Sequence, residues 1–390
     1  MFETLSHLAL QQYWWIIIAL LGGILVFLMF VQGGQTFIFQ MGKTETEKTL
    51  LVNSLGRKWE FTFTTLVTFG GAFFASFPLF YATSFGGAYW VWIAILFAFI
   101  VQAVSYEFRT KPNNVFGSKT YEVLLFINGL LATVLIGTAV GTFFNGANFQ
   151  LDEMNFCTWQ NSAYGLEAVL NFHNVALGLA VFFLSRVLGL LYFMNNIDNN
   201  SIFKESKKQL LSNSALFLVF FLTFVIWLLL KDGFAYNPET KQVFMEEYKY
   251  LHNLLQMPLN TLLFLVGVVG VLWGIFISLF KDSTKGIWFA GGGTILTVFA
   301  LFILAGFNNT AFYPAFPFDG AISADAAQLE HFIQSSLTIE NSSSSPYTLI
   351  TMSYVSLLIP FVVAYIAYTW NAINSKKLDS SELEEKSHIY

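Results

Sequence analysis

The sequence contains little charge. Only 11% of its 390 residues are Asp, Glu, Lys or Arg, which is less than half of the ~25% that is usual in soluble domains. Hydrophobic residues make up 55% of the chain, 45 residues are Phe, and the mean hydropathy is +0.60. This composition excludes an ordinary soluble protein and indicates an integral membrane protein.

Cysteine is nearly absent too. The single Cys157 excludes an intrachain disulfide and a cysteine-based metal site. The glycine run at 291–293 lies in an apolar stretch and lacks the lysine of a phosphate-binding loop, and no basic patch supports nucleic-acid binding. The first 15 residues carry no Lys or Arg, so they lack the positive region of a cleavable secretory signal, and the first apolar run is expected to remain.

The long apolar runs predict an all-α membrane protein. Each run approaches or exceeds the ~20 residues that a helix needs to cross the ~30 Å hydrocarbon layer. None alternates like a membrane β-strand, and all exceed the ~10 residues of such a strand. We therefore expect nine transmembrane helices, at residues 13–39, 61–83, 88–106, 121–144, 168–193, 214–230, 259–280, 286–306 and 348–371.

The positions of the cations predict the orientation. On one side, the loops and the C-terminal tail contain 15 of the 19 Lys and Arg residues. The opposite loops contain only Lys231, Lys241 and Lys249, and residues 307–347 contain no cation. Because cationic loops stay in the cytoplasm, we expect the N-terminus outside and the C-terminus inside. The 15 are Lys43, Lys48, Arg57, Lys58, Arg109, Lys111, Lys119, Lys204, Lys207, Lys208, Lys281, Lys285, Lys376, Lys377 and Lys386.

Nine spans suggest a division of the chain into two similar bundles. Four helices return the chain to its starting side, so two four-helix groups would have the same orientation. We expect a first four-helix bundle at 1–150, a second at 151–306, an outside loop at 307–347, and a peripheral ninth helix with its cytoplasmic tail at 348–390.

Ionisable residues inside membrane spans are costly and therefore informative. Glu60 and Glu107 both fall at cytoplasmic helix ends, where two carboxylates could gather protons and pass them inward. The alternative is structural: Glu60 stabilises a helix N-terminus, and Glu107 pairs with Arg109 or Lys111. Both interpretations remain open from the residues alone.

The helix that follows Glu60 is rich in threonine. Glu60, Thr64 and Thr68 lie at i, i+4 and i+8, which places them on one helix face in a stripe ~12 Å long. Their hydroxyl groups could relay a proton or hold water. They could equally bond back to the helix carbonyls, which is the commoner role of threonine in membrane helices.

A haem would need axial ligands, usually His, Met or Cys. Only His173 of the five histidines lies in a span, so a bis-histidine haem site within the membrane is excluded. A hydrogen-bonded histidine in helix packing or at an interface is favoured over a haem ligand. Arg186, also inside a span, could extend toward the cytoplasm or pair with an anionic group of a partner.

Several blocks of the sequence resemble a known family. VNSLGRKWE, GGAFFASFPLFYA, YEFRTK, SSLTIENSSSSPYTLITMSY and the closing KSHIY occur in the order typical of subunit II of the cytochrome bd quinol oxidases. The resemblance implies a respiratory oxidase of the bacterial cytoplasmic membrane that oxidises a quinol and reduces dioxygen to water. It implies that haems b and d lie on a partner, subunit I, and that this chain binds none. The expected role of this chain is to scaffold subunit I and to supply a proton inlet from the cytoplasm and an apolar route for oxygen. A small single-helix accessory subunit, membrane lipids and a structural quinone are further expected partners.

The resemblance also implies site residues. A Trp–acid pair of the family is implicated in proton entry, and Trp59 and Glu60 occupy its place. Charges common in the family are replaced here by Gln32, Gln35 and Gln102. The predicted proton path comprises Trp59, Glu60, Thr64, Thr68 and Glu107, and the predicted partner or interface charges are Arg109, His173 and Arg186. A secondary transporter, in which Arg186 and the carboxylates bind a substrate, is the alternative.

Overall fold

The computed structural model describes residues 2–112, 114–318 and 320–379. Within these residues eight helices are long and apolar enough to cross a membrane, and a bent helix pair raises the number to as many as nine. The predicted all-α membrane fold is therefore confirmed. The spans are α1 and α2 (His7–Leu28 and Phe30–Gln35), α7 (Tyr89–Phe108), α8 (Ser118–Asn145), α9 (Phe172–Asn196), α10 (Asn200–Leu230), α12 (Pro258–Phe280), α13 (Gly286–Gly306), and α17 with α18 (Pro346–Ser356 and Ile359–Ile373).

The bent pair corresponds to the helix predicted at 61–83. Helix α4 (Glu45–Gly56) begins with a capping box at Thr44 and leads through a short turn into α5 (Trp59–Ser76). The chain then turns by 117° into α6 (Pro78–Phe80) and the π-helical turn η2 (Tyr81–Gly87). Pro78 has no N–H to continue the helical ladder, so the straight part of the span ends before it.

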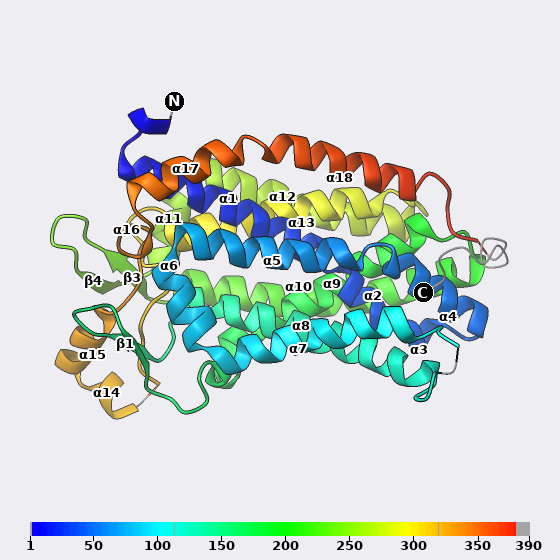
Figure 1. Cartoon of the computed structure of the whole chain (residues 1–390), viewed down its shortest axis with the longest axis horizontal. Helices are drawn as coiled ribbons and strands as arrows, with labels where there is room; N and C mark the ends of the chain where they lie inside the picture. The colour runs from blue at the N-terminus through cyan, green and yellow to red at the C-terminus, as the bar shows by residue number, and fades with distance from the viewer. Residues whose placement is uncertain (1, 113, 319, 380–390) are drawn as a thin grey trace.

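The long helices lie side by side along the longest axis of the molecule (Figure 1). Helix α1 packs on α5 and α13, whereas α2 packs on α8 and α9. Further close pairs are α7 with α8, α8 with α9, α9 with α10, and α12 with α13. Contacts between α8 and α9 and between α1 and α13 thus join the two four-helix groups expected from the sequence.

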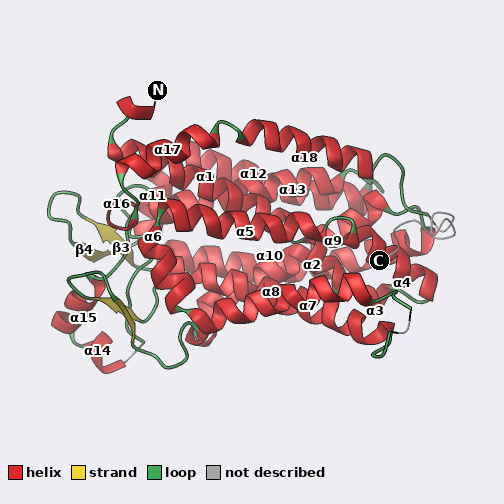
Figure 2. Cartoon of the chain, in the orientation of Figure 1, coloured by secondary structure: helices red, strands yellow, loops and turns green. Residues whose placement is uncertain are grey.

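One end of the helix layer is covered by the connecting segments (Figure 2). They form two hairpins, β1–β2 (Phe149–Leu151 with Cys157–Trp159) and β3–β4 (Gly233–Tyr236 with Val243–Glu246), and the short helices α11 (Lys249–Gln256), α14 (Gly320–Ala324), α15 (Ala326–Ile333) and α16 (Ile339–Ser342). The ring of Phe312 lies 4.4 Å from that of Trp15, so the segment after α13 reaches into the core between the helices.

The opposite end holds α3 (Ile38–Met41), α4 and the C-terminal region (Figure 1). There Leu378 forms an isolated bridge with Ile197 and is fully buried, so the chain after α18 packs against the end of α9. Most cations of the predicted cytoplasmic side lie at this end; Lys386 lies outside the described residues.

Candidate functional site

The predicted proton-path residues begin at the first turn of α5. The Trp59 indole stacks on the Tyr106 ring of α7, with 6.0 Å between centroids and 15° between planes. Glu60 is exposed in the first turn, where the helix dipole favours a negative charge, and it has no ion-pair partner among the described residues. The stack therefore fixes the start of α5, and the neighbouring carboxylate points outward.

The two threonines share the exposed face with Glu60. The Thr64 hydroxyl donates to the backbone oxygen of Glu60 at 2.7 Å, and the Thr68 hydroxyl donates to the backbone oxygen of Thr64 at 2.7 Å. Their hydrogens are thus used within the helix, as the structural alternative expected. Their oxygens still lie on the outer face and keep acceptor capacity.

Glu107 and Arg109 point in different directions. Glu107 pairs with Lys111 at 2.8 Å, and both side chains are more than half exposed. Arg109 instead turns inward, where its guanidinium donates to Glu122 at 2.9 Å and both side chains are buried. The structure therefore does not bring Glu107 close to the inner polar groups.

Glu122 was missed as a site residue. It lies at the second position of the predicted span 121–144, where its carboxylate is 1% exposed and also lies 3.8 Å from Lys48. A carboxylate inside an apolar run was the available signal. Its partner lies 13 residues away, across the turn between α7 and α8, which spacing alone did not reveal.

Gln32, Gln35 and Gln102, the glutamines singled out in the sequence, form a buried neutral group between α2 and α7. Gln32 donates to the side-chain oxygen of Gln102 at 3.3 Å, and Gln35 donates to the Tyr106 hydroxyl at 2.9 Å. All three amides are fully buried. Because an amide does not titrate, these residues can orient neighbouring groups but cannot carry a proton as a carboxylate does.

His173 is a fully engaged core residue. Its Nδ1 lies 2.9 Å from the side-chain oxygen of Asn145, and its Nε2 lies 2.9 Å from the backbone oxygen of Phe224. Its ring also stacks on Phe224 and on Trp227. With both nitrogens hydrogen-bonded, neither is free to bind haem iron, so His173 does not fit the role of an axial ligand.

Arg186 is held by neutral groups. Its Nε donates to Asn213 at 2.7 Å, and one terminal nitrogen donates to Thr36 at 2.9 Å. The guanidinium lies 4.0 Å from the centroid of the Phe37 ring, a cation–π geometry. Arg186 thus ties α9 to α10 and to the end of α2, and its pairing with a partner's charge stays a prediction.

Comparison with known proteins decides the family. The family model for cytochrome bd terminal oxidase subunit II matches residues 10–373. The chain belongs to this family. It is 26% identical to the probable cytochrome oxidase subunit 2 of Haemophilus influenzae, over 97% of this chain and 98% of that one. It is 25% identical to the cytochrome bd-I ubiquinol oxidase subunit 2 of Escherichia coli K12, over 98% and 99% of the two chains.

The solved structures agree on the fold. The bd oxidase from Geobacillus thermodenitrificans matches 94% of this chain and 99% of its own with a TM-score of 0.61, at 12% identity. The protein is therefore a multi-helix subunit of a terminal oxidase complex of the bacterial inner membrane, and it has a partner subunit. None of these relatives is a transporter, so the transporter alternative has no support.

Proposed function

We propose that this subunit II completes a quinol:oxygen oxidoreductase in which it scaffolds the haem-bearing subunit I and supplies a proton inlet from the cytoplasm and an apolar route for oxygen. The name of the Escherichia coli relative, a ubiquinol oxidase subunit, supports quinol as the electron donor. The haems b and d would lie on subunit I, which agrees with the hydrogen bonds that occupy both nitrogens of His173.

The distribution of cations supports the orientation of the inlet. Lys231, Lys241 and Lys249 belong to the end covered by the hairpins, whereas the start of α5 lies at the opposite end with α3 and α4 (Figure 1). By the positive-inside rule, the end that holds α3, α4 and the start of α5 is the cytoplasmic one. Glu60 would then meet the proton donor side of the membrane.

One observation carries the inlet proposal. Glu60, Thr64 and Thr68 form a polar stripe on the exposed face of a membrane helix. Polar and ionisable side chains in spans usually face protein or a water-filled cavity, because contact with hydrocarbon is costly. Subunit I is therefore the expected cover of this face, and the stripe would line a seam between the two subunits along which a proton can enter.

A second helix provides the contrast. The exposed positions of α12 are all apolar or aromatic, as suits a surface that contacts lipid. Five of them are Leu259, Leu262, Leu265, Val266 and Val269, each at least half exposed. The difference between the outer faces of α5 and α12 supports α5 as the side that binds a partner.

The test replaces the carboxylate while keeping its shape. Glu60→Gln in the purified complex should retain haem content but slow quinol-driven oxygen uptake, by roughly 10²-fold if the group is an obligatory proton carrier. Glu60→Asp should be mild. Glu45→Gln is the matched control, because Glu45 is also exposed near this end and pairs with Lys48 on the same helix.

The outcome is read as turnover per haem between pH 6 and 9. Uptake by Glu60→Gln that equals the wild-type rate over this range would contradict the proton-inlet role. The structural alternative predicts only a loss of ~0.3–1 kcal/mol in helix stabilisation, which would appear as a lower melting temperature without a change in turnover.

A further inference from the structure

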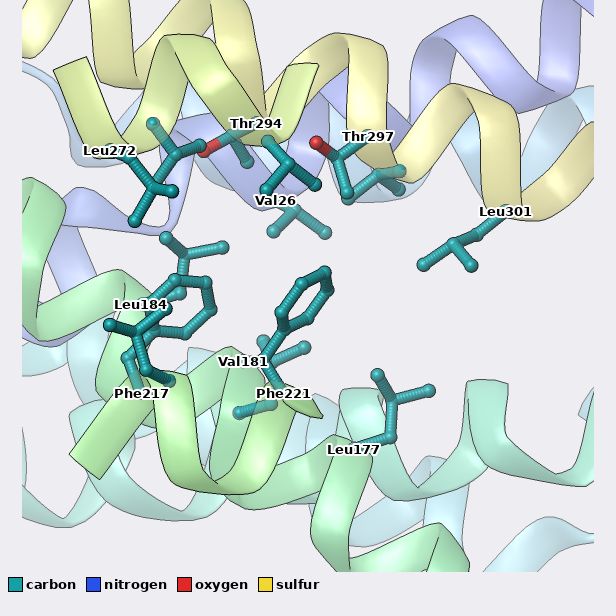
Figure 3. A pocket seen from close by; sticks show the side chains of 15 residues that line it. Val26, Leu177, Val181, Leu184, Phe217, Phe221, Leu272, Thr294, Thr297 and Leu301 are labelled. Carbon is teal, nitrogen blue, oxygen red and sulfur yellow. The ribbon is translucent and has the colours of Figure 1, made fainter. Parts of the chain in front are cut away.

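The spaces between the helices differ in what lines them. One of about 50 Å³ lies between α9, α10, α12 and α13 and is apolar apart from Thr294 and Thr297, which face Val181 and Phe221 across it (Figure 3). Both threonine hydroxyls donate to the backbone of their own helix. This space suits the apolar oxygen route of the proposed function. A second space, of about 20 Å³, differs because a carboxyl group lines it.

The second space lies at the end of the molecule that the hairpins cover, where four segments distant in the sequence meet. Its polar side chains come from η2, from α8, from the short helix η3 (Leu166–Leu170) and from the chain after α13. In that order they are Ser84, Thr142, Glu167 and Tyr313. All four are more than nine-tenths buried. The other lining residues are apolar, aromatic or glycine, so these four side chains decide what the space can bind.

Glu167 has one satisfied and one unsatisfied oxygen. Its Oε2 accepts a hydrogen bond from the backbone N–H of Gly165 at 2.7 Å. Its Oε1 is buried and has no hydrogen-bond partner among the described residues. A buried acceptor that has lost its water and gained no partner destabilises the fold, so a partner for this oxygen is expected.

The hydrogen bonds around the space leave both donors and acceptors for a small molecule. The indole N–H of Trp92 donates to the Ser84 hydroxyl at 3.4 Å, and the Thr142 hydroxyl donates to its own helix at 2.6 Å. The hydrogens of the Ser84 and Tyr313 hydroxyls can rotate toward the space, and the Thr142 oxygen keeps a lone pair. A molecule that both donates and accepts hydrogen bonds therefore matches the lining.

The volume admits one water molecule. A water needs roughly 10–15 Å³ of such space and two to four polar partners. The space of about 20 Å³ meets both conditions with Glu167, Ser84 and Tyr313. A divalent cation would need about six oxygen ligands, which is more than the four polar side chains offer. An organic ligand would need a far larger space.

No cation among the described residues pairs with the Glu167 carboxyl group, so its ionised form is not stabilised. Burial raises the pKa of Glu167, and the hydrogen bonds that it accepts from the backbone offset this only in part. The other titratable residue of the lining is Tyr313, and burial raises its pKa too. Cys157 on β2, whose ionisation would act on Tyr313, has a pKa raised to about 11 by burial. Because η2, α7 and α8 contribute no titratable residue to the lining, the groups that face Glu167 are neutral near pH 7.

We propose that this space binds one water molecule and that Glu167 stays protonated there near pH 7, with its proton shared with the water. A neutral acid both donates and accepts, so one water can bridge Glu167 to Ser84 and Tyr313 and join η3 to η2 and to the chain after α13. The site lies at the opposite end of the molecule from Glu60 (Figure 1). In the orientation predicted from the cations it takes its proton from the outside solution, so it is separate from the proton inlet and does not depend on it.

The first test is a density map of the purified oxidase complex at neutral pH that resolves ordered water. We expect one water within hydrogen-bond distance of Glu167 Oε1. Glu167→Gln keeps the shape of a neutral acid and should keep the water, whereas Glu167→Leu should lose it. Glu153→Gln is the matched control, because Glu153 is exposed in the turn of the β1–β2 hairpin at the same end. An empty wild-type space, or a metal ion in it, overturns the proposal.

The second test detects the proton by infrared spectroscopy and by thermal melts. The absorption of one protonated carboxyl group should be present in the wild type at pH 7, lost in Glu167→Gln and retained in Glu153→Gln. A raised carboxyl pKa stabilises the fold fully below the unfolded value of 4.5, and this contribution is lost as the pH rises through the folded pKa. Between pH 6 and 10 the wild type should therefore melt progressively lower than Glu167→Gln, while Glu153→Gln follows the wild type.

Three outcomes of the second test contradict the protonated site. Equal carboxyl absorption in the wild type and in Glu167→Gln would show that Glu167 is ionised. Parallel melting profiles for these two complexes would show that its ionisation does not differ between the folded and unfolded states. Loss of haem or of assembly in Glu167→Gln would show that the negative charge itself is needed, because a neutral acid can be replaced by an amide of the same shape.

Discussion

At the scale of single residues, Lys58 is the least expected feature. The sequence places it among the cations of a cytoplasmic loop, but the structure buries it completely. Its Nζ has no hydrogen-bond partner in the described part of the chain and lies 4.6 Å from the centroid of the Trp370 ring and 5.8 Å from that of Phe61. The aromatic rings thus provide the main attraction that offsets the loss of hydration.

Replacing Lys58 tests this balance. Lys58→Met keeps the long side chain and removes the charge. The variant should therefore melt at the same temperature as the wild type or higher, with a gain of at most about 1–2 kcal/mol in the free energy of unfolding. Lys58→Ala also removes the packing of the chain and should destabilise by ~2–5 kcal/mol. If both variants melt at the same reduced temperature, the charge itself stabilises the fold and this account is wrong.

The buried pair of Arg109 and Glu122 leads to the opposite prediction. Removing one partner leaves an uncompensated buried charge, so Arg109→Met or Glu122→Met alone should cost about 3–5 kcal/mol. The double variant Arg109→Met with Glu122→Met should recover most of that loss, since neither charge remains. Thermal melts and haem content of the four complexes form a double-mutant cycle, and strictly additive losses would contradict a coupled pair.

At the scale of helices, length and composition predicted most spans because the hydrocarbon thickness imposes a minimum length on every apolar run. The break of the second span was signalled by Pro78. The bonding of Thr64 and Thr68 to their own helix was one of two alternatives that the sequence left open. The burial of Glu122 was not predictable, because spacing along one helix does not say which face a neighbouring helix covers. The small helices after residue 307 were also missed, since they are held by contacts with residues far away in the sequence, such as the hydrogen bond that the Gln11 amide donates to the backbone oxygen of Glu340 in α16.

The contact between α12 and α13 offers a test at this scale. A Cβ on Gly274 would lie 2.5 Å from the backbone oxygen of Gly286, so Gly274→Ala should force the helices apart and cost about 1–3 kcal/mol. Gly292→Ala is the control on α13, because nothing lies within 4 Å of its added Cβ and alanine favours the helix. Equal melting temperatures for the two variants would show that the contact between α12 and α13 tolerates a wider spacing of the helices.

At the scale of the whole molecule, the stability of the end that carries the β1–β2 and β3–β4 hairpins depends on ionic contacts that respond to pH. Burial alone would raise the pKa of Glu246, but hydrogen bonds from His252 and Lys249 outweigh it and hold that pKa below its usual value. A lowered carboxyl pKa stabilises the fold above the unfolded value of 4.5, and this contribution is lost as the pH falls through the folded pKa.

The complex should therefore lose melting temperature as the pH falls below about 4.5, and Glu246→Gln should show a weaker decline. At neutral pH the variant should cost less than about 1 kcal/mol, because the contact is partly solvated. Glu239→Gln, on the exposed tip of the same hairpin, should retain the wild-type profile. Identical acid profiles for all three proteins would exclude Glu246 as a contributor.

The last prediction concerns which outer face binds subunit I. With Cys157 replaced by Ser, a single cysteine at Thr64 on α5 or at Leu265 on α12 gives one reactive group on each face; Leu265 is 55% exposed in this chain. A lipid-soluble maleimide should label Leu265→Cys to the same extent in the isolated subunit and in the complex. Thr64→Cys should react in the isolated subunit but at least ~10-fold more slowly in the complex, because a packed interface excludes the reagent. Equal labelling of Thr64→Cys in both states would place the polar stripe against lipid, and the seam between the subunits would then lose the surface on which the proton-inlet proposal depends.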